Sequence, residues 1–354
     1  MTSATFDVIK ILLPAVLSFL IGIGITPMLS GIMYKHRLWR RVSRSKVNTA
    51  EMSADFQKIH NEKGENSTPR VGGVLVWLSI LVTIAFLYGL ALFFPNEATE
   101  KLSFLSRNQT LLPLAVLLLG SFIGLSDDLL QIFGTAKQTS DGISRNLRIL
   151  VVTLIGSACA WWFYFKLQVL SIDVPFFGEF ELGLLFIPFF IFVVLGVFSG
   201  SVIDGIDGLA AGVMIAAYAA YMVIAFSQNQ IDLAAFCAVV IGGLLAFLWF
   251  NIPPARFYLG ETGMLGLTVA LAIVAFLTRE VLLLPIIAFP LFITSISSSM
   301  QMFSKKYLGR KILRIAPLHH HFEAIGWPSY KVTMRYWVIS TVMAILGTII
   351  AILG

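Results

Sequence analysis

Long apolar segments alternate with short charged ones throughout this chain, and that alternation limits its fold more than any other feature. Only 12% of the 354 residues are Asp, Glu, Lys or Arg, whereas 58% are hydrophobic, with a mean hydropathy of +0.87. A soluble domain of this length would expose far more charge. The sequence therefore predicts an all-α polytopic membrane protein.

A membrane-spanning helix needs roughly 20 predominantly apolar residues. A window of that length finds ten candidate spans, at residues 8–33, 71–94, 110–126, 148–168, 182–199, 206–226, 232–250, 262–278, 281–303 and 332–353. The first is too long for a signal-peptide core, so we expect it to be retained as a helix. The chain shows no linker or internal repeat, which predicts one integral membrane domain over residues 1–354.

Basic residues are concentrated in alternate polar segments: residues 34–70, 127–148, 252–261 and 304–335 contain 20 of the 25 Lys and Arg residues and all five His residues. By the positive-inside rule these loops are cytoplasmic, which places both termini on the outer side and an active site at the cytoplasmic face. The cytoplasmic loops are expected at about residues 34–70, 127–148, 199–206, 252–261 and 304–331. The net charge of +6 is explained by this orientation signal and predicts no nucleic-acid partner.

A polar segment from Arg310 to Trp327, RKILRIAPLHHHFEAIGW, lies between two of the apolar spans. Helix packing alone does not require three consecutive histidines there. His319, His320 and His321 cannot all face one metal ion, because neighbouring helical residues point in different directions. We expect one or two of them to bind phosphate and the third to be structural.

Five acids lie at the expected cytoplasmic helix ends, where intramembrane carboxylates usually serve function. Asp127 and Asp128 are expected to end the third span, and Glu261 to begin the eighth. Asp204 and Asp207 are expected to share one face at the start of the sixth span, where one of them could be an N-cap. Hard oxygen ligands beside many basic groups predict a site for Mg²⁺ and phosphate.

These segments together resemble the phospho-N-acetylmuramoyl-pentapeptide transferases, which are polyprenyl-phosphate N-acetylhexosamine-1-phosphate transferases. The resemblance extends over the whole chain, and the triple-histidine segment is its most specific part. The matching stretches are His60 and Lys63, TPRVGG at 68–73, SDD at 126–128, GISRNLR at 142–148, DGIDGLAAG at 204–212, FNIPPARFYLGETG at 250–263 and APLHHHFEAIGWPSYKVTMRYW at 316–337.

The resemblance implies a multi-pass enzyme of the bacterial plasma membrane. Its substrates would be UDP-MurNAc-pentapeptide and undecaprenyl phosphate, its cofactor Mg²⁺, and its products lipid I and UMP. The implied catalytic residues are Asp127, Asp128, Glu261 and His319, and the first three would also hold the metal. The implied substrate-binding residues are Lys63, Thr68, Arg148, Asp204, Asp207, Asn251, Tyr258, His320 and His321.

The chain departs from the family pattern at four positions near these motifs. Glu261 stands where Asp is usual, Gln131 where Lys is usual, and Phe198 and Ser201 where two asparagines are expected. Three alternatives stay open. The protein is the transferase that the resemblance implies, a related transferase for another UDP-N-acetylhexosamine, or a degenerate paralogue that binds lipid phosphate or acts as a scaffold. A lipid-phosphate or ion transporter is disfavoured, because the acids lie at helix ends rather than mid-span. The sequence also leaves open whether the protein forms a homodimer.

Overall fold

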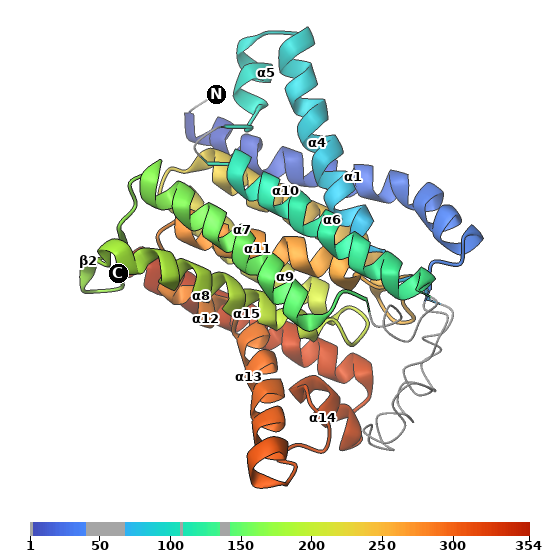
Figure 1. Cartoon of the computed structure of the whole chain (residues 1–354). Coiled ribbons are helices and arrows are strands. Elements are labelled where there is room, and N and C mark those ends of the chain that lie inside the picture. Colours follow the sequence, from blue (N-terminus) through green and yellow to red (C-terminus); the bar gives the residue numbers. More distant parts are fainter. Residues whose placement is uncertain (1–2, 40–67, 107–108, 135–141) are drawn as a thin grey trace.

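A computed structural model describes residues 3–39, 68–106, 109–134 and 142–354 of the chain. Nearly all of them are helical (Figure 1). The α-helices are α1 (Ser3–Lys35), α4 (Gly73–Phe93), α5 (Glu97–Leu102), α6 (Leu111–Phe133), α7 (Arg145–Phe165), α8 (Phe186–Ser199), α9 (Leu209–Ser227), α10 (Ile231–Asn251), α11 (Gly260–Leu277), α12 (Leu284–Ile287), α13 (Phe289–Phe303), α14 (Leu318–Ala324) and α15 (Ser329–Leu353). Short 3₁₀ or π turns are η2 (Gly183–Leu185), η3 (Gly200–Ile203), η4 (Val281–Leu283) and η5 (Ser304–Leu308).

The number of spans agrees with the sequence prediction. Among the described residues, nine helices are long and apolar enough to cross a membrane. A tenth span is obtained if the helices at Val281–Ile287 and Phe289–Leu308, which are bent by 80° at the break between them, count as one. Figure 1 shows α13 leaving the bundle at this bend, with α14 beside it. The fold class is thus confirmed, whereas the orientation of the bundle stays a prediction.

Helix α11 is the centre of the bundle. Every residue from Thr262 to Phe276 is buried, so this helix is covered on all sides by its neighbours. The outer helices α1 and α15 instead present large apolar side chains such as Leu12, Val16 and Val338 at the surface, as helices facing lipid do. Because α11 is packed on all sides, the residues at its ends are held in fixed positions.

Glycines bring α6 unusually close to α11. A Cβ on Gly120 would lie 2.7 Å from Cα of Gly266, and a Cβ on Gly124 would overlap the backbone of Glu261. Small residues allow this kind of close approach between membrane helices. Because Gly124 is one helical turn before Asp127 and Asp128, this contact brings both aspartates to the N-terminal end of α11.

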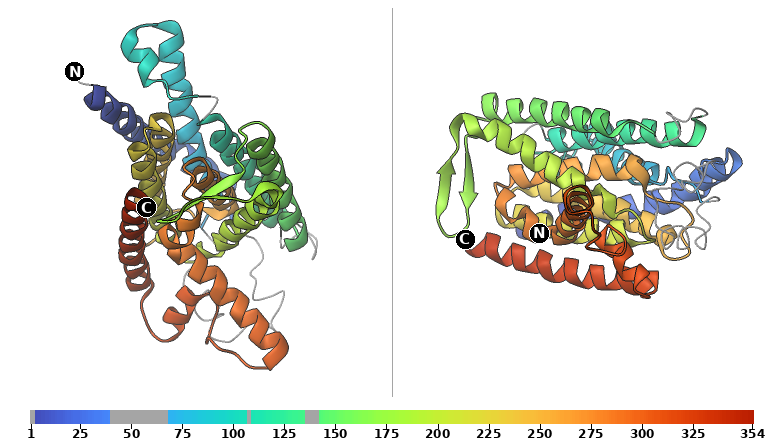
Figure 2. Two further views of the ribbon diagram at one scale, coloured as in Figure 1. Left: turned by 90° about the vertical axis from the view of Figure 1, so that its left-hand side faces the viewer. Right: turned by 60° about the horizontal axis from the view of Figure 1, so that its bottom comes forward.

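A short antiparallel hairpin, β1 (Ser171–Val174) and β2 (Gly178–Glu181), connects α7 to η2 and α8. Figure 2 shows the hairpin at the same end of the bundle as the C-terminus. Arg279 fastens it to the bundle through an ion pair with Glu179 and a longer one to Asp173, in which Nε and Oδ2 are 3.5 Å apart.

Candidate active site

Asp127 and Asp128 lie within α6 rather than at its end, which corrects the sequence prediction. The helix continues to Phe133, because the residues after the aspartates are still good helix formers. Both carboxylates are buried, with exposed fractions of 0% and 1%. Their partners therefore come from other segments rather than from water.

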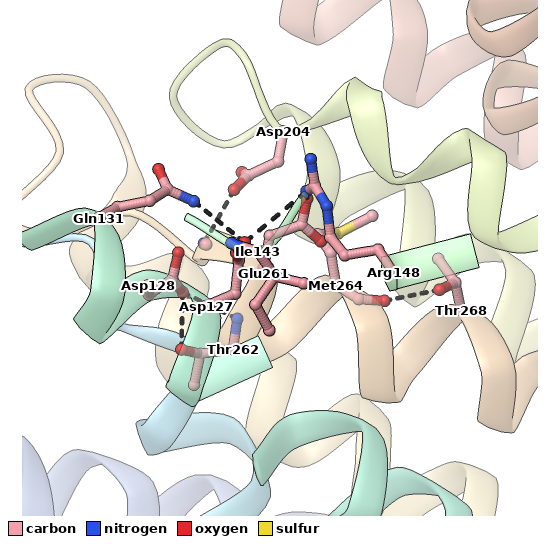
Figure 3. A network of polar contacts seen from close by, with 11 residues as sticks. Asp127, Asp128, Gln131, Ile143, Arg148, Asp204, Glu261, Thr262, Met264 and Thr268 are labelled. Carbon is pink, nitrogen blue, oxygen red and sulfur yellow. Dashed lines mark hydrogen bonds and ion pairs between the residues drawn. The ribbon is translucent and has the colours of Figure 1, made fainter. Parts of the chain in front are cut away.

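The two aspartates have different partners, as Figure 3 shows. Oδ2 of Asp128 accepts hydrogen bonds from the backbone N–H of Thr262 at 2.9 Å and from its hydroxyl at 2.7 Å. Asp127 accepts from Nε2 of Gln131 at 3.0 Å and from the backbone N–H of Ile143. Asp128 is therefore tied to α11, and Asp127 to the segment that precedes α7.

Arg148 joins Asp127 to Glu261. Its Nη1 lies 2.7 Å from Oε1 of Glu261 and 3.7 Å from Oδ2 of Asp127. Glu261 is in the first turn of α11, because this helix begins at Gly260, two residues before the predicted span of 262–278. One guanidinium group thus connects three segments of the site, and Figure 3 shows it reaching between the two carboxylates.

Asp204 and Asp207 precede α9 instead of lying on its first turn, so the predicted shared helical face and N-cap are both wrong. The residue before α9 is Gly208, whose φ of 75° lies in the left-handed region that favours glycine. Oδ2 of Asp204 accepts from the N–H of Gly260 at 2.9 Å, and Oδ2 of Asp207 accepts from the N–H of Ala255 at 3.0 Å. Both carboxylates therefore bind the backbone of the segment that leads into α11.

Burial raises the pKa of the Asp204 carboxyl above its ordinary value, and the neighbouring Asp207 acts in the same direction. The N–H of Gly260 and the guanidinium of Arg70 oppose this effect. The site thus holds its negative charge at a cost, which a bound cation would relieve.

Asn251 holds the two backbone segments together. Its Oδ1 accepts from the N–H of Gly208 at 2.8 Å, and its Nδ2 donates to the carbonyl of Phe257 at 2.9 Å. Helix α15 supports the same turn, since Thr333 donates to the carbonyl of Asp207 and Trp337 to that of Gly208, both at 3.1 Å. Asn251 therefore has a structural role in this turn, and its substrate-binding role stays a prediction.

Two of the three histidines face the aspartate turn. His319 and His320 are buried on α14, and a Cβ on Gly205 would lie 2.8 and 2.7 Å from their respective Nε2 atoms. Nδ1 of His320 is 2.7 Å from Oε2 of Glu323, whose Oε1 accepts from the hydroxyl of Ser329 at 2.5 Å. Glu323, which sequence reasoning did not select, fixes the orientation of His320.

His321 points elsewhere. Its Nδ1 accepts from the backbone N–H of Arg314 at 3.2 Å, which is a structural contact within the segment before α14. Gln301 on α13 holds the same segment, since its Oε1 accepts from the N–H groups of Ile312 and Leu313 at 3.1 and 3.0 Å. His321 thus makes a structural contact, and its implied substrate-binding role stays a prediction.

The end of the first loop pairs with the segment before α11. Tyr258 donates its N–H to the carbonyl of Pro69 at 2.8 Å and accepts from the N–H of Gly72 at 2.9 Å. This pairing places Arg70 beside the acids, with Thr68 two residues before it, whereas Lys63 lies outside the described residues. The sequence prediction missed Arg70, although its position in TPRVGG, just before the Gly-Gly pair, was a usable signal.

The carboxylates suit a hard divalent cation. The described ranges contain no group of three or more His, Cys, Asp or Glu residues arranged to hold a metal ion. Mg²⁺, however, usually takes only one or two carboxylates and completes its shell with water and substrate phosphate. Oε2 of Glu261 is buried without a hydrogen-bond partner in the described part of the chain, and the Asp127 carboxylate faces the same guanidinium. This donor set fits Mg²⁺ bound together with phosphate.

Comparison with known proteins gives a consistent result. The family model of glycosyl transferase family 4 matches residues 110–279. Three similar proteins are each named phospho-N-acetylmuramoyl-pentapeptide-transferase. The one from Clostridium perfringens strain 13 is 29% identical over 340 residues, covering 96% of this chain and 98% of its own. Those from Geobacillus sp. strain WCH70 and Dichelobacter nodosus are 30% and 33% identical, covering 96% and 83% of this chain and 97% and 82% of their own.

Proposed function

Because the chain belongs to the phospho-N-acetylmuramoyl-pentapeptide-transferase family, we propose that it transfers phospho-MurNAc-pentapeptide from UDP-MurNAc-pentapeptide to undecaprenyl phosphate. Family membership makes it a multi-pass bacterial membrane enzyme that transfers a sugar 1-phosphate to a polyprenyl phosphate. The proposal adds the two substrates, the products lipid I and UMP, and a requirement for Mg²⁺.

One observation carries the proposal: Asp127 and Glu261, from helices far apart in sequence, meet around Arg148 at one end of α11, and Asp128 is bonded to Thr262 in the first turn of the same helix. Phosphoryl transfer depends mainly on positioning and on neutralising the charge of the transferring group. A buried group of carboxylates with guanidinium groups and imidazoles beside it provides both.

In the proposed reaction an oxygen of the lipid phosphate attacks the phosphorus that carries the sugar. A new P–O–P linkage forms, the bond to UMP breaks, and the electron pair leaves with the UMP phosphate. Asp127 or Asp128 accepts the proton of a singly protonated lipid phosphate as it attacks. Asp128 is held rigidly for this role, because both the N–H and the hydroxyl of Thr262 bind one of its oxygens.

The remaining side chains bind and orient the substrates. Asp204 and Asp207 shape the nucleotide side together with Tyr258, and His319 and His320 approach the diphosphate or sugar. Asp127 and Glu261 would hold Mg²⁺, with Asp128 beside them, and the ion would supply positive charge to the diphosphate. Arg148 supplies further charge on the same side of the site.

Release of UMP by purified protein tests this proposal. The protein would be incubated with undecaprenyl phosphate and, in separate reactions, with UDP-MurNAc-pentapeptide, UDP-GlcNAc or UDP-GalNAc. The proposal predicts UMP only with the muramyl peptide. UMP with a simpler sugar would instead indicate a related transferase, and silence with every donor from folded protein would indicate a degenerate paralogue.

A further inference from the structure

Arg70 is held at the site by its backbone. Its N–H donates to the carbonyl of Leu38 at 3.0 Å, and Pro69 and Gly72 pair with the segment that leads into α11. A Cβ on Gly260 would overlap the carbonyl of Arg70 and a carboxylate oxygen of Asp128. The left-handed φ of 68° at Gly260 and this close approach fix Arg70 against the start of α11.

The guanidinium group of Arg70 lies near several acids, and within the described residues it forms no hydrogen bond or ion pair with any of them. It acts electrostatically on Asp128, Asp204 and Glu261. Its Nε is buried without a hydrogen-bond partner in the described part of the chain. Arg148 differs, because its guanidinium is already in contact with Glu261 at 2.7 Å. Arg70 is therefore a cation at the site that keeps an unpaired donor among the described residues.

Negative charge at this point would increase once a phosphate-bearing substrate binds. Asp127, Asp128, Asp204 and Glu261 contribute carboxylates, and a diphosphate substrate adds further negative charge. Position 131, which lies beside Asp127, is occupied by Gln, an uncharged residue. A guanidinium group binds phosphate oxygens through several N–H donors at once, so an additional Arg is well suited to this site.

We propose that Arg70 binds a phosphate group of the substrates and supplies the positive charge that Gln131 does not. The inference rests on the proposed function for the identity of the substrates, but its chemistry requires only phosphate oxygens at the site. The phosphate could belong to the nucleotide diphosphate or to the lipid phosphate, and these two sources are separated by experiment.

The test measures binding without turnover. Calorimetric titration of purified wild type, Arg70→Gln and Arg70→Lys with UDP gives the affinity for a diphosphate. Titration with undecaprenyl phosphate in nanodiscs gives the affinity for the lipid. Because Arg70→Gln removes one charge-assisted contact, it should weaken the affinity for one of these two ligands about 10- to 100-fold. Arg70→Lys keeps the positive charge but loses the several N–H donors of the guanidinium group. Its affinity is therefore expected to lie between those of the wild type and Arg70→Gln.

Two further variants separate a local role from a general loss of charge. Arg37 is exposed at the end of α1, one residue before Leu38, so Arg37→Gln removes a nearby charge without altering the site. It should change both affinities less than twofold. Gln131→Lys in the Arg70→Gln background restores a cation beside Asp127 and should recover at least part of the lost affinity.

Unchanged affinity for both ligands in Arg70→Gln, with an unfolding midpoint like that of the wild type, would overturn the inference. An equal loss of affinity in Arg37→Gln would also overturn the inference, because the effect would then come from the overall positive charge of this region and not from a contact of Arg70. If Arg70→Gln does not fold, the Arg70→Lys affinities decide: wild-type values for both ligands would contradict a guanidinium-specific contact. Failure of the proposed function would appear differently, as UDP binding that depends on Arg70 without turnover of the muramyl peptide.

Discussion

Nη1 of Arg148 lies 2.7 Å from Oε1 of Glu261, although 113 positions separate the two residues in the chain. The same guanidinium group lies 3.7 Å from Oδ2 of Asp127, so one side chain of α7 connects α6 to the first turn of α11. The family resemblance named all three residues without showing that they meet. Because these three residues meet, substitutions in the site are expected to have defined effects on turnover and stability.

Asp127→Asn and Asp128→Asn should each lower turnover at least about 100-fold, the lower bound for loss of a general base. The amide keeps the shape of the carboxylate, so both variants should still insert and fold. Comparison of UMP release with the yield and unfolding midpoint of purified protein checks this. Wild-type turnover in both variants would show that the catalytic pair is misplaced.

Gly205→Ala should reduce activity with little change in stability. The new Cβ would lie 2.7 and 2.8 Å from Nε2 of His320 and His319, so the imidazoles must move. Misplacement of a positioned group by about 1 Å can cost on the order of 100-fold in rate.

The matched control is Gly24→Ala on α1, where an added Cβ meets nothing within 4 Å. Steady-state kinetics of both variants provide the comparison. If Gly205→Ala were as active as Gly24→Ala, the close packing of the histidines against the turn would not matter for the reaction.

Asn251→Leu should destabilise the protein by about 1–3 kcal/mol, because it leaves the buried N–H of Gly208 without its acceptor. The thermal unfolding midpoint in detergent measures this, with the exposed Asn146→Ala as a control. An unchanged midpoint together with lost affinity for UDP would contradict this prediction and would support the substrate-binding role of Asn251 that the family resemblance implies.

Glu280 should give the fold a dependence on pH. Burial, with a smaller contribution from Asp173, raises the pKa of its carboxyl from 4.5 to about 7. Between these two values the folded protein holds a proton that the unfolded chain has released, so this group's contribution to stability falls as pH rises.

Glu280→Gln removes that contribution. The unfolding midpoint of the variant relative to wild type should therefore be higher at pH 8 than at pH 5. Glu181→Gln, in the exposed strand β2, is the control. A constant difference between variant and wild type at both pH values would contradict the raised pKa.

The sequence was sufficient for the fold class and for the segments that form the site. Apolar length and periodicity identify spans because lipid leaves a buried backbone few alternatives to helix. The exact bounds of the helices and the positions of the site residues within them could not be predicted from the sequence. Asp127 and Asp128 were expected at a helix end, but α6 continues for five residues beyond them, since nothing in the following LLQIF stops a helix.

The turn at Asp204 and Asp207 shows a different limit. The i, i+3 spacing suggested a helical face, whereas a left-handed Gly208 delays the helix and turns both carboxylates toward backbone N–H groups 48 to 56 positions away. Contacts at such separations cannot be read from spacing. Arg70 was not selected as a site residue although its place in TPRVGG was a signal; its proximity to the acids arises when the first loop pairs with the segment before α11.

The most direct test of the account is transfer of a radiolabelled phospho-MurNAc-pentapeptide to undecaprenyl phosphate by purified protein, titrated with Mg²⁺ and compared with Glu261→Gln. We predict label in the lipid phase that requires Mg²⁺ and undecaprenyl phosphate. Glu261→Gln should need at least about tenfold more Mg²⁺ for half-maximal transfer, because a metal-holding carboxylate is lost. Absence of lipid-phase label at every Mg²⁺ concentration, from folded wild-type protein that binds UDP, would contradict the account.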